Sequence, residues 1–82
     1  METSLDQTLS ALADPTRRRV IDLLRKRPRR AGELADLLSM TRPAMSRHLR
    51  LLRKGGLAIV DGGTLQALLR PAELAAIAAS RA

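Results

Sequence analysis

The sequence predicts one small, mainly α-helical domain with five helices and a two-stranded β-hairpin. Apolar residues recur at spacings of three and four through most of the chain, as they do along one face of a helix. Proline one or two positions after a capping residue marks two places where helices begin, and glycine pairs bound a short apolar run near residue 60. The chain has 82 residues, the length of one domain. A domain this small buries only about 60–65% of its unfolded surface, so a partner subunit would stabilise it.

The first predicted helix covers residues 4–13. Leu5, Leu9 and Leu12 follow the spacing i, i+4, i+7 and therefore share one helical face. Three leucines on one face need an apolar cover from another part of the fold or from a second copy of the chain.

The second predicted helix runs from Pro15 to Lys26. Asp14 is a suitable N-cap and Pro15 a suitable first-turn residue. Three arginines, residues 17–19, follow at the helix start, where positive charge opposes the helix dipole. Two explanations stay open: ion pairs with Asp14, Asp22 or another helix, or contact with phosphate.

Residues 31–54 form two predicted helices joined by a short turn. The first covers Ala31 to Leu38, and the second begins at about Arg42. Thr41 can cap the second helix, and Pro43 fits within its first turn. Such a pair of helices is typical of the helix-turn-helix, in which the second helix enters a DNA major groove.

The second helix of this pair is amphipathic. Met45, Leu49 and Leu52 follow the i, i+4, i+7 spacing and face inward. In the alternative explanation, the polar face only keeps a small protein in solution. The cap with its proline, the short turn and a small serine between arginines favour DNA binding instead. The residues on the outward faces are Arg42, Ser46, Arg47, Arg50 and Arg53.

We predict that Arg42 and Arg47 contact base edges, because arginine can bond to guanine O6 and N7 at once. The other residues of the predicted site are expected to contact DNA phosphate, or both phosphate and base edges. They include Arg30, which stands beside the first helix of the pair. The predicted DNA-binding residues are Arg30, Thr41, Arg42, Ser46, Arg47 and Arg50.

The rest of the chain predicts a small β-wing and a last helix. Gly55 and Gly56 end the preceding helix. Two strands within residues 57–69 flank a tight turn at residues 61–64. A final helix covers residues 71–81, which completes a winged helix-turn-helix.

A winged helix-turn-helix core leaves the apolar faces of the first and last helices without a cover. We predict a homodimer through these helices, because a two-fold DNA site suits a two-fold protein. In the alternative, both helices fold back onto their own subunit. The predicted interface residues are Leu5, Leu9, Leu12, Leu74, Ile77 and Ala78.

The formal net charge of +7 is unevenly placed along the chain. Residues 17–54 contain thirteen Lys and Arg residues and three Asp and Glu residues, which gives this segment a net charge of +10. The rest of the chain contains two Lys and Arg residues and five Asp and Glu residues, a net charge of −3, and the two values add up to +7. Such asymmetry indicates a polyanionic partner. The chain has no aromatic residue to stack on a splayed base, which favours double-stranded DNA over RNA or single strands.

Other classes of protein fit the composition less well. With no cysteine, one histidine and carboxylates without apparent pairing, we predict neither an enzyme nor a metal or other cofactor. No apolar run approaches the ~20 residues of a membrane span. The N-terminus lacks the basic start and apolar core of a secretion signal, so we expect a cytoplasmic protein.

Three segments together resemble one family of bacterial winged-helix repressors. They are ALADPTRRRV at residues 11–20, AGELA at 31–35 and SRHLRLL at 46–52, and the family is ArsR/SmtB. The resemblance implies a homodimer that binds an operator with paired recognition helices and usually represses its own operon. It matches Thr41, Arg42, Ser46, Arg47 and Arg50 to DNA-reading positions.

The resemblance also matches His48 to a family histidine, which we interpret as partly packed, with DNA contact as the alternative, and not as a metal ligand. Classical metal sensors of the family carry cysteines on the first motif helix, or His and acidic ligands on the last helix, and those ligands are absent here. This indicates the non-metal-sensing branch, controlled by a partner protein, another signal or autoregulation. The wing tip at residues 61–64 has no Lys or Arg, which argues against minor-groove contact.

The sequence therefore predicts a sequence-specific transcriptional regulator that binds double-stranded DNA, as a dimeric repressor or autorepressor without metal control. Two alternatives use the same basic face. One is a protein-interaction module, and the other is a non-specific architectural DNA-binding protein.

Overall fold

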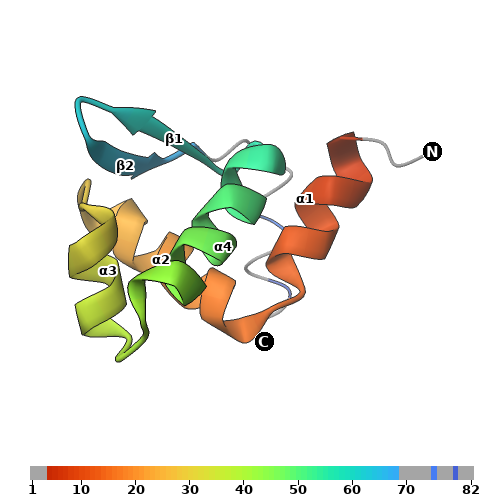
Figure 1. Cartoon of the computed structure of the whole chain (residues 1–82). Helices are drawn as coiled ribbons and strands as arrows, with labels where there is room; N and C mark the ends of the chain where they lie inside the picture. Colours follow the sequence, from red (N-terminus) through yellow and green to blue (C-terminus); the bar gives the residue numbers. More distant parts are fainter. Residues whose placement is uncertain (1–3, 69–74, 76–78, 80–82) are drawn as a thin grey trace.

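A computed structural model describes residues 4–68, 75 and 79 of the chain (Figure 1). The predicted last helix, residues 71–81, lies outside the described residues except for Ala75 and Ala79, and so do its predicted interface residues Leu74, Ile77 and Ala78. The described part is mainly helical, with four helices and a two-stranded antiparallel sheet. The elements are α1 (Ser4–Leu12), α2 (Pro15–Lys26), α3 (Ala31–Leu37), α4 (Arg42–Lys54), β1 (Ala58–Asp61) and β2 (Thr64–Ala67).

The helix starts follow the predicted capping residues. The Asp14 carboxylate accepts a hydrogen bond from the Arg17 backbone N–H at 3.0 Å, at the start of α2. The Thr41 hydroxyl accepts one from the Ala44 backbone N–H at 3.3 Å, at the start of α4. These bonds satisfy amide groups that have no partner within the helix. Helix α3 ends one residue earlier than predicted, before a turn in which Ser39 has a left-handed φ of 53°.

Two arginines at the start of α2 contact another helix, as the first of the two predicted explanations allowed, but their hydrogen-bond partners are backbone carbonyls. Arg17 donates side-chain hydrogen bonds to Ser10 O and Ala11 O, and Arg18 donates to Leu12 O and Ala13 O. The last carbonyl groups of a helix lack internal partners and carry partial negative charge. The end of α1 therefore provides the favourable contact for these two cations.

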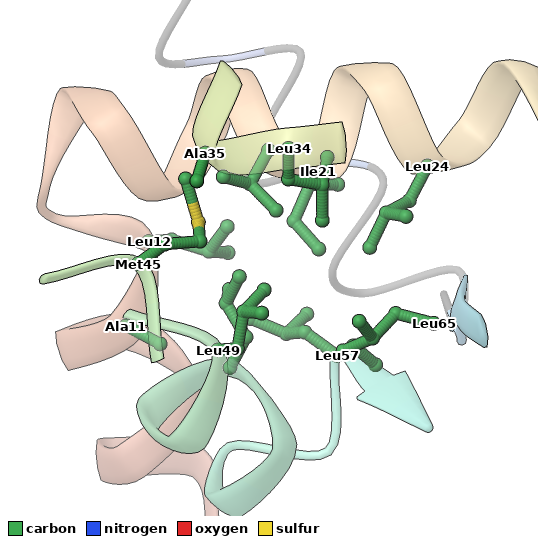
Figure 2. Packing of buried hydrophobic residues seen from close by; sticks show 13 residues of the cluster. Ala11, Leu12, Ile21, Leu24, Leu34, Ala35, Met45, Leu49, Leu57 and Leu65 are labelled. Carbon is green, nitrogen blue, oxygen red and sulfur yellow. The ribbon is translucent and has the colours of Figure 1, made fainter. Parts of the chain in front are cut away.

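A hydrophobic core joins every described element (Figure 2). Helix α4 contributes the predicted inward residues, and α2 and α3 face it from the other side of the cluster. The core also contains Leu12 of α1, which is 7% exposed, whereas Leu9 is 50% exposed. The expectation that the α1 leucines lack a cover in their own subunit is therefore wrong for Leu12, because α1 packs against α2 and α4 at that end. The core residues are Ala11, Leu12, Val20, Ile21, Leu24, Leu34, Ala35, Met45, Leu49, Leu52, Leu57, Ala58 and Leu65.

The two strands of the wing lie within the predicted range of residues 57–69, and Leu69 is outside the described residues. Strands β1 and β2 pair from Ala58 with Ala67 to Asp61 with Thr64. Gly62 and Gly63 form the turn with φ of 60° and 86°, a conformation that glycine adopts without a steric penalty.

The loop before α3 extends the sheet by one bridge. Arg29 N donates to Leu65 O at 3.1 Å, and Leu65 N donates to Arg29 O at 2.7 Å. The wing is therefore fixed to the start of the helix-turn-helix.

No helix in the described ranges is long and apolar enough to cross a membrane.

Candidate nucleic-acid interface

Helix α4 presents one basic face to solvent. Arg42, Ser46, Arg47 and Arg50 are all exposed, as predicted, while Met45, Leu49 and Leu52 are buried. At about 100° of rotation per residue, the exposed four fall within an arc of roughly 140°. Arg53 and Lys54 are exposed on the same arc. The helix can therefore offer a continuous row of cations and one small hydroxyl to a single surface.

The side chains of Ser46, Arg47 and Arg50 make no hydrogen bond or ion pair within the part of the chain that the structure describes. Arginine has only donor groups and stays charged at any physiological pH. An unpaired guanidinium in solvent is therefore ready to bond phosphate or a base edge. Thr41 uses a lone pair as the helix cap, so its O–H group is left as a donor.

Arg42 differs from the other arginines of this face. Its guanidinium lies against the first turn of α3, because a Cβ added at Gly32 would stand 3.1 Å from Arg42 Nη2 and 3.3 Å from Cζ. A shallow groove there is lined by Arg30, Gly32 and Arg42 together with acidic and apolar residues of α3. Of the two predicted base-contacting arginines, Arg47 is thus the one that lies away from α3.

The basic connection between α2 and α3 divides into paired and free arginines. Glu33 Oε2 accepts hydrogen bonds from Arg27 and, at 2.8 Å, from Arg29. The bond from Arg29, supported by the one from Arg27 and by both charges, holds the pKa of Glu33 below its ordinary value. Arg30 is exposed at the N-cap of α3, and its side chain makes no hydrogen bond or ion pair with the described residues. Arg30 is therefore the arginine of this connection that remains available to a ligand.

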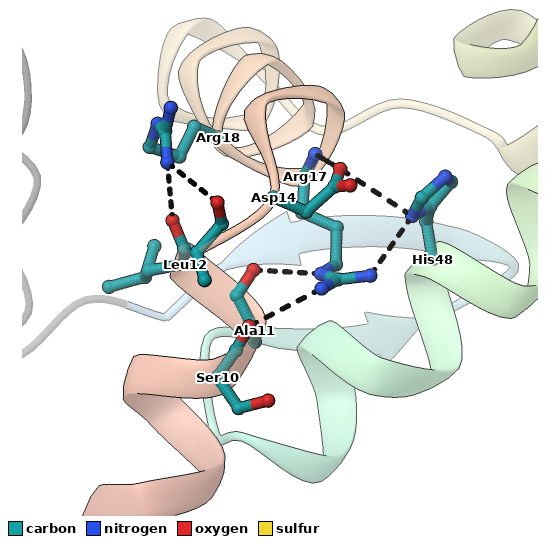
Figure 3. A network of polar contacts seen from close by, with 8 residues as sticks. Ser10, Ala11, Leu12, Asp14, Arg17, Arg18 and His48 are labelled. Atoms are coloured by element: carbon teal, nitrogen blue, oxygen red, sulfur yellow. Dashed lines mark hydrogen bonds and ion pairs between the residues drawn. The ribbon is translucent and has the colours of Figure 1, made fainter.

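His48 lies on the inward side of α4, beside the junction of α1 and α2 (Figure 3). Its Nδ1 is 3.3 Å from Arg17 Nη1 and 3.9 Å from Asp14 Oδ2, and its side chain is 18% exposed. The ring is partly packed, as the sequence analysis expected. Burial raises the pKa of Asp14, but the hydrogen bond from the Arg17 backbone N–H and the charge of Arg17 contribute to outweighing it, so the pKa is lowered.

The contact between Arg17 and His48 was not predicted from the sequence. The two residues are 31 positions apart, and no local spacing connects them. Among residues 4–68, 75 and 79, no group of three or more His, Cys, Asp or Glu side chains could hold a metal ion.

The wing presents apolar and acidic side chains. Ile59 is 42% and Val60 48% exposed on β1. Asp61 at the turn accepts a hydrogen bond from Gln66 Nε2 at 3.2 Å. The strands and turn from residue 57 to 68 contain no Lys or Arg, so they add no cation to the basic face of α4.

Comparison with known proteins agrees with this arrangement. A family model described as a helix-turn-helix domain matches residues 12–61. The solved structure of an ArsR-like transcriptional regulator from Rhodococcus sp. RHA1 is 29% identical, with a TM-score of 0.67 over 94% of this chain and 74% of that one. The chain belongs to the ArsR/SmtB family of helix-turn-helix proteins.

Two relatives of this ArsR/SmtB chain are named as transcriptional regulators. The HTH-type transcriptional regulator Rv2034 of Mycobacterium tuberculosis is 46% identical over 50 residues, which are 61% of this chain and 47% of that protein. The transcriptional repressor SdpR of Bacillus subtilis is 34% identical over 50 residues, 61% of this chain and 56% of that protein. The chain spans about half the length of these relatives.

The ArsR/SmtB fold also occurs in the homodimeric winged helix-turn-helix DNA-binding domain of Mb0332 from Mycobacterium bovis. That structure has a TM-score of 0.76 and 23% identity, and the match covers 95% of this chain and 75% of that one. The likeness shows the fold of the chain.

Proposed function

We propose that the chain is a sequence-specific transcriptional repressor that binds double-stranded DNA as a homodimer, with α4 as its recognition helix. The observation that carries this proposal is the row of exposed cations on α4, which have no hydrogen-bond or ion-pair partner among the described residues and lie opposite a face that is buried in the core. A rigid helix with this arrangement fits the major groove, where phosphates and base edges can be reached together. A regulator of this kind would act in the cytoplasm, where the bacterial chromosome lies.

The roles of the basic residues follow from where they lie. Arg47 is assigned to base edges, since its guanidinium is exposed, has no partner within the described part of the chain, and can bond guanine at two acceptors. Arg42 is assigned to the same groove, but it must leave its position over Gly32 to extend there. The residues assigned to phosphate, alone or shared with bases, are Arg30, Thr41, Ser46 and Arg50.

The proposed dimer uses α1 and the C-terminal segment. Leu9 supports it, because half of this apolar side chain is exposed on α1. The homodimeric state of the Mb0332 domain, which has the same fold, is a second support. Leu12 serves the core of its own subunit, which leaves Leu5, Leu9, Leu74, Ile77 and Ala78 as the proposed interface.

We also propose that the repressor works without a metal effector. The chain has no cysteine, and its one histidine already contacts Arg17. Release from DNA would then depend on a partner protein, another signal or the protein's own concentration. Zinc, nickel and cobalt ions added to the DNA complex should leave its dissociation constant unchanged.

The main experiment is selection of bound fragments from a genomic library, followed by band shifts on the selected duplex and an unrelated one at two salt concentrations. A preferred duplex with a two-fold site supports the proposal. Strong salt dependence without any preferred sequence would instead indicate an architectural DNA-binding protein. Failure to bind either duplex would leave the protein-interaction module as the remaining class.

A further inference from the structure

Arg17 joins three helices through one side chain. It lies in the first turn of α2, and its Nε donates to Ala11 O at 2.7 Å and its Nη2 to Ser10 O at 3.3 Å, both at the end of α1. Its Nη1 is 3.3 Å from Nδ1 of His48, in the middle of α4 (Figure 3). With three nitrogens engaged inside the subunit, this guanidinium is poorly placed to serve DNA phosphate.

The direction of the hydrogen bond to His48 is fixed by chemistry. Arginine has only donors, so Nδ1 is the acceptor in this hydrogen bond, which corresponds to the tautomer with the ring proton on Nε2. Asp14 Oδ2, the other charged group beside the ring, is 3.9 Å from Nδ1, beyond hydrogen-bonding distance. The partner that holds the imidazole is therefore Arg17.

The position of His48 gives this bond a mechanical consequence. The residue directly follows Arg47, yet its ring is on the inward side of α4 and mostly covered. A rotation of α4 by about 10° would move a side-chain tip at a radius of about 6 Å by about 1 Å. Such a shift is large enough to break paired hydrogen bonds to a base.

We propose that Arg17 and His48 are positioning residues for DNA recognition, which fix the rotation of α4 and connect it to the end of α1. The inference rests on the proposed function, because it concerns how α4 reads DNA. It assigns to Arg17 a role in sequence preference, whereas a phosphate contact would add affinity for any sequence.

The hydrogen bond can be tested without DNA. The chain has a single histidine, so the ¹⁵N resonances of its imidazole belong to one residue, and their couplings to the ring protons distinguish Nδ1 from Nε2. Nδ1 of the wild-type ring should resonate as a nitrogen that accepts a hydrogen bond. Arg17→Lys keeps the charge but removes the forked donor, and the Nδ1 resonance should move to that of a free ring nitrogen.

The effect on recognition is measured as the ratio of affinities for the selected duplex and an unrelated one. Arg17→Lys should lower this ratio by about tenfold, the size of one charge-assisted hydrogen bond. His48→Leu should lower it similarly, while His48→Asn, which keeps an acceptor near Nδ1, should retain most of it. Arg25→Lys is the matched control on an exposed side of α2 and should leave the ratio unchanged.

The outcomes separate the possibilities. A wild-type ratio for Arg17→Lys would overturn the inference. A parallel fall in affinity for both duplexes would also overturn it, because such a fall indicates a phosphate contact or loss of folded protein. A wild-type protein without any preferred duplex would overturn the proposed function and this inference together. A preferred duplex with unchanged variants would overturn only the inference.

Discussion

Thr8 of α1 and Gly55 at the end of α4 are joined by a buried hydrogen bond. Thr8 Oγ1 donates to Gly55 O at 2.6 Å, across 47 residues of sequence. A carbonyl at a helix end has no partner within the helix, so α1 supplies the missing donor. A Cβ added at Gly55 would lie 3.1 Å from Gln7 O, so the two helices approach closely because this residue is glycine. The bond fastens the first helix directly to the proposed recognition helix.

Thr8→Val tests this attachment. Valine keeps the shape of threonine but removes the donor, and the buried Gly55 carbonyl loses its partner. The free energy of unfolding should fall by about 1–3 kcal/mol, measured by urea denaturation. Thr64→Val is the control, because the Thr64 hydroxyl bonds Asp61 O on the exposed wing. Equal losses in both variants would contradict a special role for the bond between α1 and α4.

The features that sequence predicted well depend on neighbouring residues. Asp14 and Thr41 cap helices through amides three positions away, so the starts of α2 and α4 are visible in the sequence. The buried and exposed faces of α4 also follow from spacing alone. The proposed DNA-binding face could therefore be located before any coordinates were known.

The features that sequence missed depend on residues brought together by folding. Arg17 meets His48 across 31 positions, and the burial of Leu12 depends on how α1 packs against two other helices. In the same way, sequence could not separate Arg29, which pairs with Glu33, from Arg30, which does not. Two neighbouring arginines cannot be distinguished by sequence when only the folded structure brings an acidic partner to one of them.

Arg47→Ala tests the assignment of the base-contacting residue. The substitution should cost about 1–3 kcal/mol of binding free energy on the selected duplex and should relax base preference at one position of each half-site. Affinities of the variant for duplexes with single base changes provide the measurement. Arg25→Ala, which removes an exposed arginine from α2, is the charge-matched control. Unchanged affinity in Arg47→Ala would show that another residue reads the DNA.

Arg30→Gln and Arg29→Gln should affect different properties although the residues are adjacent: the first the salt dependence of DNA binding, the second the stability of the fold. Arg30 is exposed and makes no capping bond, so its loss should reduce the slope of log affinity against log salt by about 0.9 per phosphate contact, without changing base preference. Arg29 bonds Leu23 O and Glu33, so its loss should lower the free energy of unfolding instead. Band shifts over a salt series and urea denaturation of both variants distinguish them. A reduced salt slope in Arg29→Gln alone would reverse the assignment.

Glu33 should make the stability of the fold depend on pH. Its pKa is lowered in the folded protein, chiefly by the hydrogen bond from Arg29, so the unfolded chain binds the proton more tightly. The stabilisation is complete above the ordinary carboxyl pKa and is lost as the pH falls through the lowered folded value. Urea denaturation from neutral pH to about pH 3 should show this loss, and Glu33→Gln should flatten it. Glu33→Gln with the wild-type acid dependence would place the responsible carboxylate elsewhere.

Leu9→Asp tests the proposed dimer. Leu9 and Leu37 are both 50% exposed, but they lie on α1 and α3 respectively. A charge at a buried apolar interface is strongly unfavourable, so Leu9→Asp should convert the dimer to a monomer in light scattering, while Leu37→Asp should keep the wild-type mass. The Leu9 variant should also lose affinity for a two-fold site but keep weak binding to a single half-site, because its α4 face is intact. A Leu9→Asp protein that remains dimeric would exclude α1 from the interface, and a monomeric wild type would remove the basis for paired recognition helices.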